Sequence, residues 1–103
     1  MKDDHIGQIR EHATGGNADA QFRLGVMHLF GQGVDKSASA ALEWFERAAV
    51  QGHADAQFNL GEAYFFGLGV SKDDRKSAEW LERAAAQGHS KAQFRLGRMY
   101  RSG

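Results

Sequence analysis

The chain has 103 residues, of which 42% are hydrophobic and 25% are charged, a balance typical of one soluble globular domain. Lysine and arginine together number 13, as do aspartate and glutamate, so the chain lacks the basic excess that neutralises nucleic-acid phosphates. Cysteine is absent, which excludes disulfides, thiolate metal sites and a cysteine nucleophile.

The amino-terminal residues and the lack of cysteine predict where the protein works. No apolar stretch follows Lys2, so we expect no secretory signal, and no apolar run approaches the roughly 18 residues of a membrane span. A chain without cysteine suits a reducing compartment. We therefore expect a cytoplasmic location, with a periplasmic one open if a signal has already been removed.

The first predicted element, within residues 1–17, is a single helix. Its apolar residues Ile6, Ile9 and Ala13 recur at helical spacing, and Gly16 follows them, as glycine often follows a helix. The same register recurs further along the chain at Leu42, Phe45, Ala49 and Gly52. Residues 1–17 are therefore interpreted as a degenerate leading copy of that later helix.

The rest of the chain is a repeated unit. The run Ala18-Asp-Ala-Gln-Phe-Arg-Leu-Gly25 recurs as Ala54-Asp-Ala-Gln-Phe-Asn-Leu-Gly61 and as Ser90-Lys-Ala-Gln-Phe-Arg-Leu-Gly97. The start moves from 18 to 54 to 90, a constant step of 36 residues, and such a period is typical of repeat arrays. We expect one domain, 1–103, with a leading helix at 1–17, repeats at 18–53 and 54–89, and the first half of a third at 90–103.

Each repeat predicts two helices. In the second copy, the first helix begins after His53 and runs to about Phe66, with small and apolar residues along one face. Polar residues that cap helix starts recur at equivalent positions. The predicted caps are Asn17, His53 and His89 for the first helices, and Ser37 and Asp73 for the second helices. Gly52 and Gly88 are predicted to follow the second helix in the left-handed conformation.

One glycine lies inside the first helix of every copy, at Gly25, Gly61 and Gly97. A glycine there costs about 1 kcal/mol relative to alanine, so its recurrence predicts the close approach of a neighbouring helix. Trp44 and Trp80 also share one position. Because they recur with the fold, we interpret them as packing residues rather than as ligand platforms.

This pattern resembles the Sel1-like repeat. Residues 54–70 carry the whole run Ala-x-Ala-x-x-x-Leu-Gly-x-x-Tyr-x-x-Gly-x-Gly-Val, and Trp-x-x-x-Ala-Ala-x-x-Gly follows it. The first copy has His28 in place of the tyrosine. A tetratricopeptide array has a period of about 34 residues and usually carries proline, so the 36-residue step and the absence of proline favour Sel1.

The resemblance implies an all-α fold, a right-handed α/α superhelical solenoid of helix-turn-helix repeats. It also implies that the first helices line a concave surface, and that the protein is an adaptor that assembles protein complexes. Some secreted bacterial relatives are cysteine-rich, with disulfides that clamp each repeat. This chain departs from that branch because it has no cysteine.

No catalytic residue, metal site or cofactor is predicted. The Gly-x-Gly-Val runs that begin at Gly31 and Gly67 follow helices and lack phosphate-loop spacing, so they are interpreted as turns. His53 and His89 occupy equivalent positions in neighbouring repeats, about 10 Å apart if the helices stack normally. That separation is too large for one shared zinc ion. The carboxylate pairs Glu43–Glu46 and Glu79–Glu82 lie beside arginines on a solvated face, where general acid–base catalysis is not expected.

The candidate partner-binding residues differ between copies on the first helix, because the shared residues are needed for folding. They are Asp19, Arg23, Val26 and Phe30 in the first copy, Asp55, Asn59, Glu62 and Phe66 in the second, and Lys91, Arg95 and Arg98 in the third. Their charge changes from mixed to acidic to basic. This stripe predicts a peptide of alternating charge with an aromatic or aliphatic anchor near Phe30 or Phe66.

Three functions stay open. The first is a non-catalytic interaction or scaffold module that binds a protein or peptide, without nucleic acid, membrane insertion or cofactor. The second is a self-associating segment of a longer array, in which Phe94, Met99 and Tyr100 of an uncovered C-terminal helix form a homo-oligomer. The third is a hydrolase related to secreted Sel1-like proteins, although the sequence shows no nucleophile–base pair.

Overall fold

The structure, a computed structural model, describes residues 2–102, and the terminal residues 1 and 103 of the expected domain lie outside that range. The described part folds into α-helices of 13 residues each, without β-strands. In chain order they are α1 (Lys2–Thr14), α2 (Ala18–Phe30), α3 (Ala38–Val50), α4 (Ala54–Phe66), α5 (Asp74–Ala86) and α6 (Ser90–Ser102). The expected all-α fold is confirmed.

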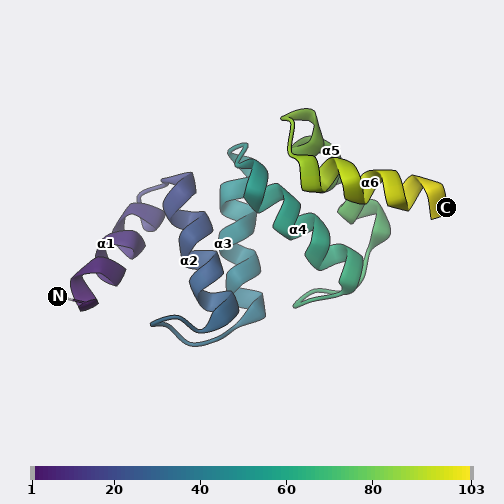
Figure 1. Ribbon diagram of the computed structural model, residues 1–103. Helices are drawn as coiled ribbons and strands as arrows, with labels where there is room; N and C mark the ends of the chain where they lie inside the picture. Colours follow the sequence, from purple (N-terminus) through teal and green to yellow (C-terminus); the bar gives the residue numbers. More distant parts are fainter. Residues whose placement is uncertain (1, 103) are drawn as a thin grey trace.

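The helices form an elongated array in which each one packs mainly on the helix before it and the helix after it. Figure 1 shows α1 at one end and α6 at the other, with the two chain termini far apart. The array measures 49 × 24 × 17 Å along its principal axes. Packing that is restricted to neighbours along the chain is the defining property of a solenoid.

The predicted helix caps are all formed. Asn17 accepts a hydrogen bond from the backbone N–H of Ala20 at 2.8 Å, and Ser37 accepts one from Ala40 at 3.1 Å. Equivalent bonds are accepted by the ring nitrogens Nδ1 of His53 and His89 and by the carboxylate of Asp73. Each satisfies one of the backbone donors that a helix start leaves without a partner. Gly52 and Gly88 follow the second helices with φ of 101° and 89°, as expected.

The glycines inside the first helices face the second helices at close range. A Cβ added to Gly25 would lie 2.6 Å from the Phe45 ring and 3.1 Å from the carbonyl oxygen of Ala41. At Gly61 the corresponding distances are 2.7 Å to Leu81 and 3.2 Å to the Ser77 carbonyl oxygen. Any side chain here would push the two helices apart, so the expected close approach is confirmed for these copies.

Both tryptophans pack between repeats, as predicted. On α3, Trp44 packs against a cluster from α1 and α2 that includes Ala13 and Leu24. On α5, Trp80 packs against the larger cluster formed by α3 and α4. The leading helix α1 contributes Ile9 to the first cluster, so it packs on α2 as α3 packs on α4. Each tryptophan therefore joins its own repeat to the one before it.

The C-terminal helix α6 is less uncovered than its sequence indicated. Phe94 and Tyr100 are 65% and 63% exposed, as expected. Leu96 is 8% exposed, however, and Met99 packs against the cluster that contains Leu81 of α5. The expectation of an uncovered residue was wrong for Met99, because it packs with Leu96 against the preceding helix α5.

Candidate partner-binding face

The first helices α2, α4 and α6 carry the predicted stripe, and two of its residues bind each other. The guanidinium of Arg95 on α6 lies 3.0 Å from the Glu62 carboxylate on α4 through Nη2, and its Nε donates to the same oxygen at 3.1 Å. The side chains are 25% and 19% exposed. The sequence treated both as exposed positions, whereas the structure shows a half-buried ion pair between repeats.

Glu62 uses only one of its carboxylate oxygens in this pair. Its Oε1 accepts the arginine, while Oε2 is buried and accepts no hydrogen bond among the described residues. A buried acceptor without a partner costs free energy.

The aspartates of the stripe contact histidines of the following repeat. His53 Nε2 lies 3.0 Å from Asp19, and the imidazole stacks on Phe22 with ring centroids 4.7 Å apart. The Nδ1 atom accepts the cap bond from Ala56 N–H, which assigns the proton to Nε2 and makes the imidazole the donor to Asp19. The three contacts together join the repeats at the start of α4.

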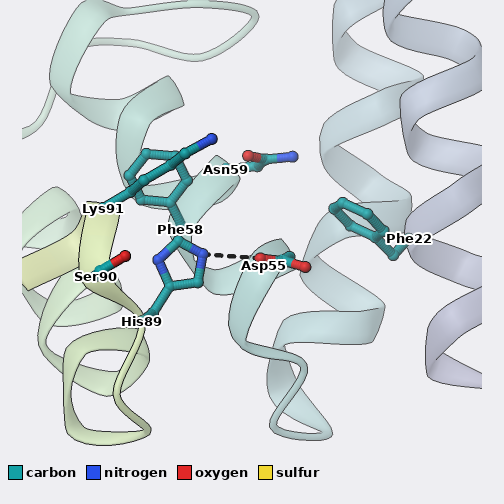
Figure 2. Close-up of a pocket in the computed structure, with 7 residues that line it drawn as sticks. All are labelled: Phe22, Asp55, Phe58, Asn59, His89, Ser90 and Lys91. Carbon is teal, nitrogen blue, oxygen red and sulfur yellow. Dashed lines mark hydrogen bonds and ion pairs between the residues drawn. The ribbon is translucent and has the colours of Figure 1, made fainter.

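The next pair of repeats has the same arrangement. Figure 2 shows His89 bonded to Asp55 across the helix starts, at 2.8 Å, and stacked on Phe58 with 4.8 Å between centroids. Both nitrogens of each histidine are thus engaged with protein groups. Among the described residues, no group of three His, Cys, Asp or Glu side chains is arranged to hold a metal ion.

A cavity of about 250 Å³ between α2, α3 and α4 brings four of the predicted residues together. These are Val26, Phe30, Asn59 and Glu62. Leu68, from the turn after α4, also lines it, and it is 55% exposed. Leu68 was not among the predicted residues, although the middle residue of the Gly-x-Gly-Val turn varies from Gln32 to Leu68 and so carried a signal.

Two further cavities continue this face toward α6. One, of about 510 Å³, is lined by Asp55, Asn59 and Lys91 among others and is drawn in Figure 2. The other, of about 410 Å³, is lined by Glu62, Lys91 and Arg95 with Phe94. Because Asn59 and Glu62 each border two of the three cavities, the cavities meet along α4.

The remaining predicted residues lie around these cavities. Arg23 is exposed on α2, and Phe66 is 53% exposed at the end of α4, with the Arg95 guanidinium 5.1 Å from its ring. Arg98 lies over Phe94 at 5.7 Å and lines a separate cavity of about 570 Å³ with Lys72 and Tyr100. The stripe is thus divided between two places. One is the cavity of about 250 Å³ between α2, α3 and α4, called the α2–α4 cavity from here on, and the other is the surface of α6.

One ionisable group in the described part has a perturbed pKa. The Tyr100 hydroxyl donates to the Glu82 carboxylate on α5 at 2.5 Å. This hydrogen bond, with a smaller contribution from desolvation, raises the pKa of Tyr100 above its ordinary 10.0. The contact joins α6 to α5. None of the helices in the described range is long and apolar enough to cross a membrane.

Stacked helices that each pack mainly on their neighbours along the chain define an α/α repeat solenoid. Residues 18–53, 54–89 and 90–103 each match the Sel1 repeat. The chain therefore belongs to the Sel1 repeat family. Proteins of this family generally act as non-catalytic scaffolds that bind protein partners.

Solved structures agree with this assignment. A Sel1 repeat protein from Oxalobacter formigenes superposes with a TM-score of 0.92 at 45% identity, over 94% of this chain and 73% of that one. The protective antigen c5321 of uropathogenic Escherichia coli, described as displaying an SLR fold, gives 0.87 at 36% identity over 89% of this chain and 20% of that one. Helicobacter pylori cysteine rich protein B shares the fold, with a TM-score of 0.84 at 21% identity over 89% of this chain and 69% of that one.

These three relatives are bacterial, which agrees with a bacterial origin for this chain. No match was found among curated proteins. The likeness to the cysteine rich protein shows that the same fold forms in a chain without cysteine. Here the glycine contacts pack the two helices of each repeat together, and the tryptophans and the histidine–aspartate bonds join neighbouring repeats.

Proposed function

We propose that this protein is a non-catalytic interaction module whose α2–α4 cavity receives an apolar side chain of a protein partner. The observation that carries the proposal is the cavity of about 250 Å³ that unites Val26, Phe30 and Leu68 beside Glu62. Large apolar side chains that stay exposed around a concave surface are typical of interaction sites.

The lining of the cavity determines the chemistry of the partner. Phe30 is 64% exposed and Leu68 is 55% exposed, so an aliphatic or aromatic side chain inserted between them would bury surface on both. The partner segment therefore carries an aliphatic or aromatic anchor side chain. We place this role in the cytoplasm, where a chain without cysteine is at no disadvantage.

The proposal is tested by selecting binding peptides from a random phage-displayed library on the native chain. The test variant combines Phe30→Ser with Leu68→Ser, and Val50→Ser is the matched control, since Val50 is 67% exposed on α3. All three changes replace exposed side chains, so the fold should be preserved. Selected peptides should share an apolar anchor, and the double variant should weaken their binding at least tenfold, about 1.4 kcal/mol.

Val50→Ser should bind these peptides as the native chain does. Peptides that bind the double variant with unchanged affinity would place the interface elsewhere. A loss of binding in Val50→Ser of the same size would contradict the proposal as well, because it would show a non-specific response to lost surface hydrophobicity.

A further inference from the structure

A second surface of the molecule is the side of α6 that carries Gly97, called its outward side. It corresponds to the faces of α2 and α4 on which α3 and α5 pack. On α2, Gly25 receives Phe45 of α3, and on α4, Gly61 receives Leu81 of α5. Gly97 holds the same position on α6, yet a Cβ there would meet only Nη2 of Arg101, at 4.0 Å. The notch for a packed helix is thus present on α6 and has no helix in it among the described residues.

The charges around this notch differ from those of the earlier copies. Phe22, Val26 and Leu29 of α2 pack against the cluster that α3 contributes to. The equivalent residues of α6 are Phe94, Arg98 and Arg101. The aromatic residue is kept, and the two aliphatic residues become arginines. With Lys91 and Arg95, α6 carries four basic residues and no acidic one.

We propose that the outward face of α6 binds an acidic amphipathic helix of a partner protein, in the position that α3 and α5 hold on their own first helices. The structure of the α2–α3 contact gives the pattern of that helix. A small residue corresponds to Ala41 at the glycine notch, and a large apolar residue follows it at the position of Phe45. Ala38 and Leu42 line one cavity with Val26 and Leu29, so acidic residues at their positions would meet Arg98 and Arg101.

A second copy of this chain is a poor occupant of the same face. Two α6 helices packed through this face would bring Arg98 and Arg101 of one copy against those of the other, which is unfavourable. The leading helix α1 carries His5 and His12 where α3 has Ala41 and Ala48, both of which are fully buried. Imidazole rings at positions of closest approach would hold α1 away from the Gly97 notch. The acidic helix of another protein is the occupant that satisfies both the notch and the charge.

The test uses two synthetic peptides based on residues 37–51 of this chain. One carries Ala38→Glu and Leu42→Glu, and its charge-reversed control carries Ala38→Lys and Leu42→Lys. Binding of each labelled peptide to the full chain is measured by fluorescence anisotropy at two salt concentrations. The acidic peptide should bind at least tenfold more tightly than the basic one, and added salt should reduce that preference.

Variants of the full chain locate the contact. Arg98→Glu combined with Arg101→Glu should reverse the preference between the two peptides, and Gly97→Leu should abolish binding by filling the notch. Circular dichroism shows whether each variant is folded. If Gly97→Leu is unfolded, Arg101→Gln still tests the proposal, because it is a mild change at an exposed position. Val50→Ser should bind as the native chain does.

Three results would overturn the proposal. The first is equal affinity of the native chain for the acidic and basic peptides. The second is an affinity for the acidic peptide that neither Arg101→Gln nor the double arginine variant changes. The third is a concentration-dependent dimer in sedimentation that is lost in Gly97→Leu. The last result would assign the face to a second copy. The test is independent of the α2–α4 cavity, because none of the substitutions made in the full chain lies in its lining.

Discussion

The contrast between Gly61 and Gly97 gives a quantitative prediction, because the same substitution meets different surroundings at equivalent positions. Alanine in place of either glycine gains about 1 kcal/mol of helix propensity. At Gly61 the new Cβ would lie 2.7 Å from Leu81 and 3.2 Å from the Ser77 carbonyl oxygen, well inside the 3.5–4.0 Å at which carbon atoms pack. Both neighbours are fully buried, so helix α5 itself has to move.

Overpacking of this kind costs about 1–3 kcal/mol. Gly61→Ala is therefore expected to change the free energy of unfolding by between no net effect and a loss of about 2 kcal/mol once the propensity gain of about 1 kcal/mol is included. At Gly97 the nearest atom lies 4.0 Å away, so the propensity gain remains and the variant should be stabilised by up to about 1 kcal/mol. Because the propensity contribution is common to both, the difference between the variants equals the cost of overpacking.

Urea denaturation followed by far-UV circular dichroism measures both free energies. In thermal melts a change of 1 kcal/mol corresponds to a shift in Tm of about 4–8 °C for a domain of this size. The Tm of Gly97→Ala should therefore lie above that of the native chain, and the Tm of Gly61→Ala should lie well below that of Gly97→Ala. Hydrogen exchange then assigns each change to α4 or α6, since the stability of a repeat array is a sum of local contributions. Equal shifts at the two positions would refute the reasoning and show that close packing does not select glycine here.

Three further predictions concern contacts between repeats. His53→Ala removes a helix cap, the bond to Asp19 and a ring stack, and should lower the free energy of unfolding by about 1–2 kcal/mol in urea; His53→Asn keeps the cap, as Asn17 does, and should lose less. Trp44→Ala should cost about 2–3 kcal/mol in the same assay, below the 3–5 typical of fully buried aromatics, because Trp44 is only partly buried. Since the pKa of Tyr100 is raised in the folded state, its contribution to stability is present below the ordinary value of 10.0 and is lost as the pH rises through the folded value. Glu82→Gln should bring the Tyr100 pKa back toward 10.0 in a phenolate absorbance titration, and an unchanged titration would contradict the assigned cause.

The parts of the fold that were predictable from the sequence depend on short-range chemistry. Helix starts at Ser37 and Asp73 follow from residues that cap the adjacent backbone, and helix ends follow from glycines in the next turn. The close helix contact at Gly61 was also predictable, because the sequence repeats an energetically unfavourable residue at one helical position. Each of these inferences needs only a few neighbouring residues and the 36-residue period.

The contacts that define the candidate site connect residues about one repeat apart, and the period alone does not show which side chains meet. Glu62 and Arg95 are 33 positions apart, and both were placed in the exposed variable stripe. His53 was predicted as a cap, but its bond to Asp19, 34 positions earlier, depends on how far one repeat is offset from the next. A helical pattern gives the face on which a residue lies, whereas the stacking of whole repeats decides its neighbour.

The repeated contacts between repeats also explain why α6 differs from α2 and α4. The bond of His53 to Asp19 recurs as His89 to Asp55, each across 34 positions, so a further repeat of the same kind would require an aspartate at position 91. The chain has Lys91 there, and a lysine donates hydrogen bonds but cannot accept one from an imidazole N–H. The residue that would bind an identical repeat is therefore replaced by a cation on the helix that also carries Arg101 beside the open notch at Gly97. Lys91 thus removes the acceptor that an identical further repeat would use, while the proposed attraction of the Gly97 notch for an acidic helix comes from Arg98 and Arg101, which the charge-reversed peptides test.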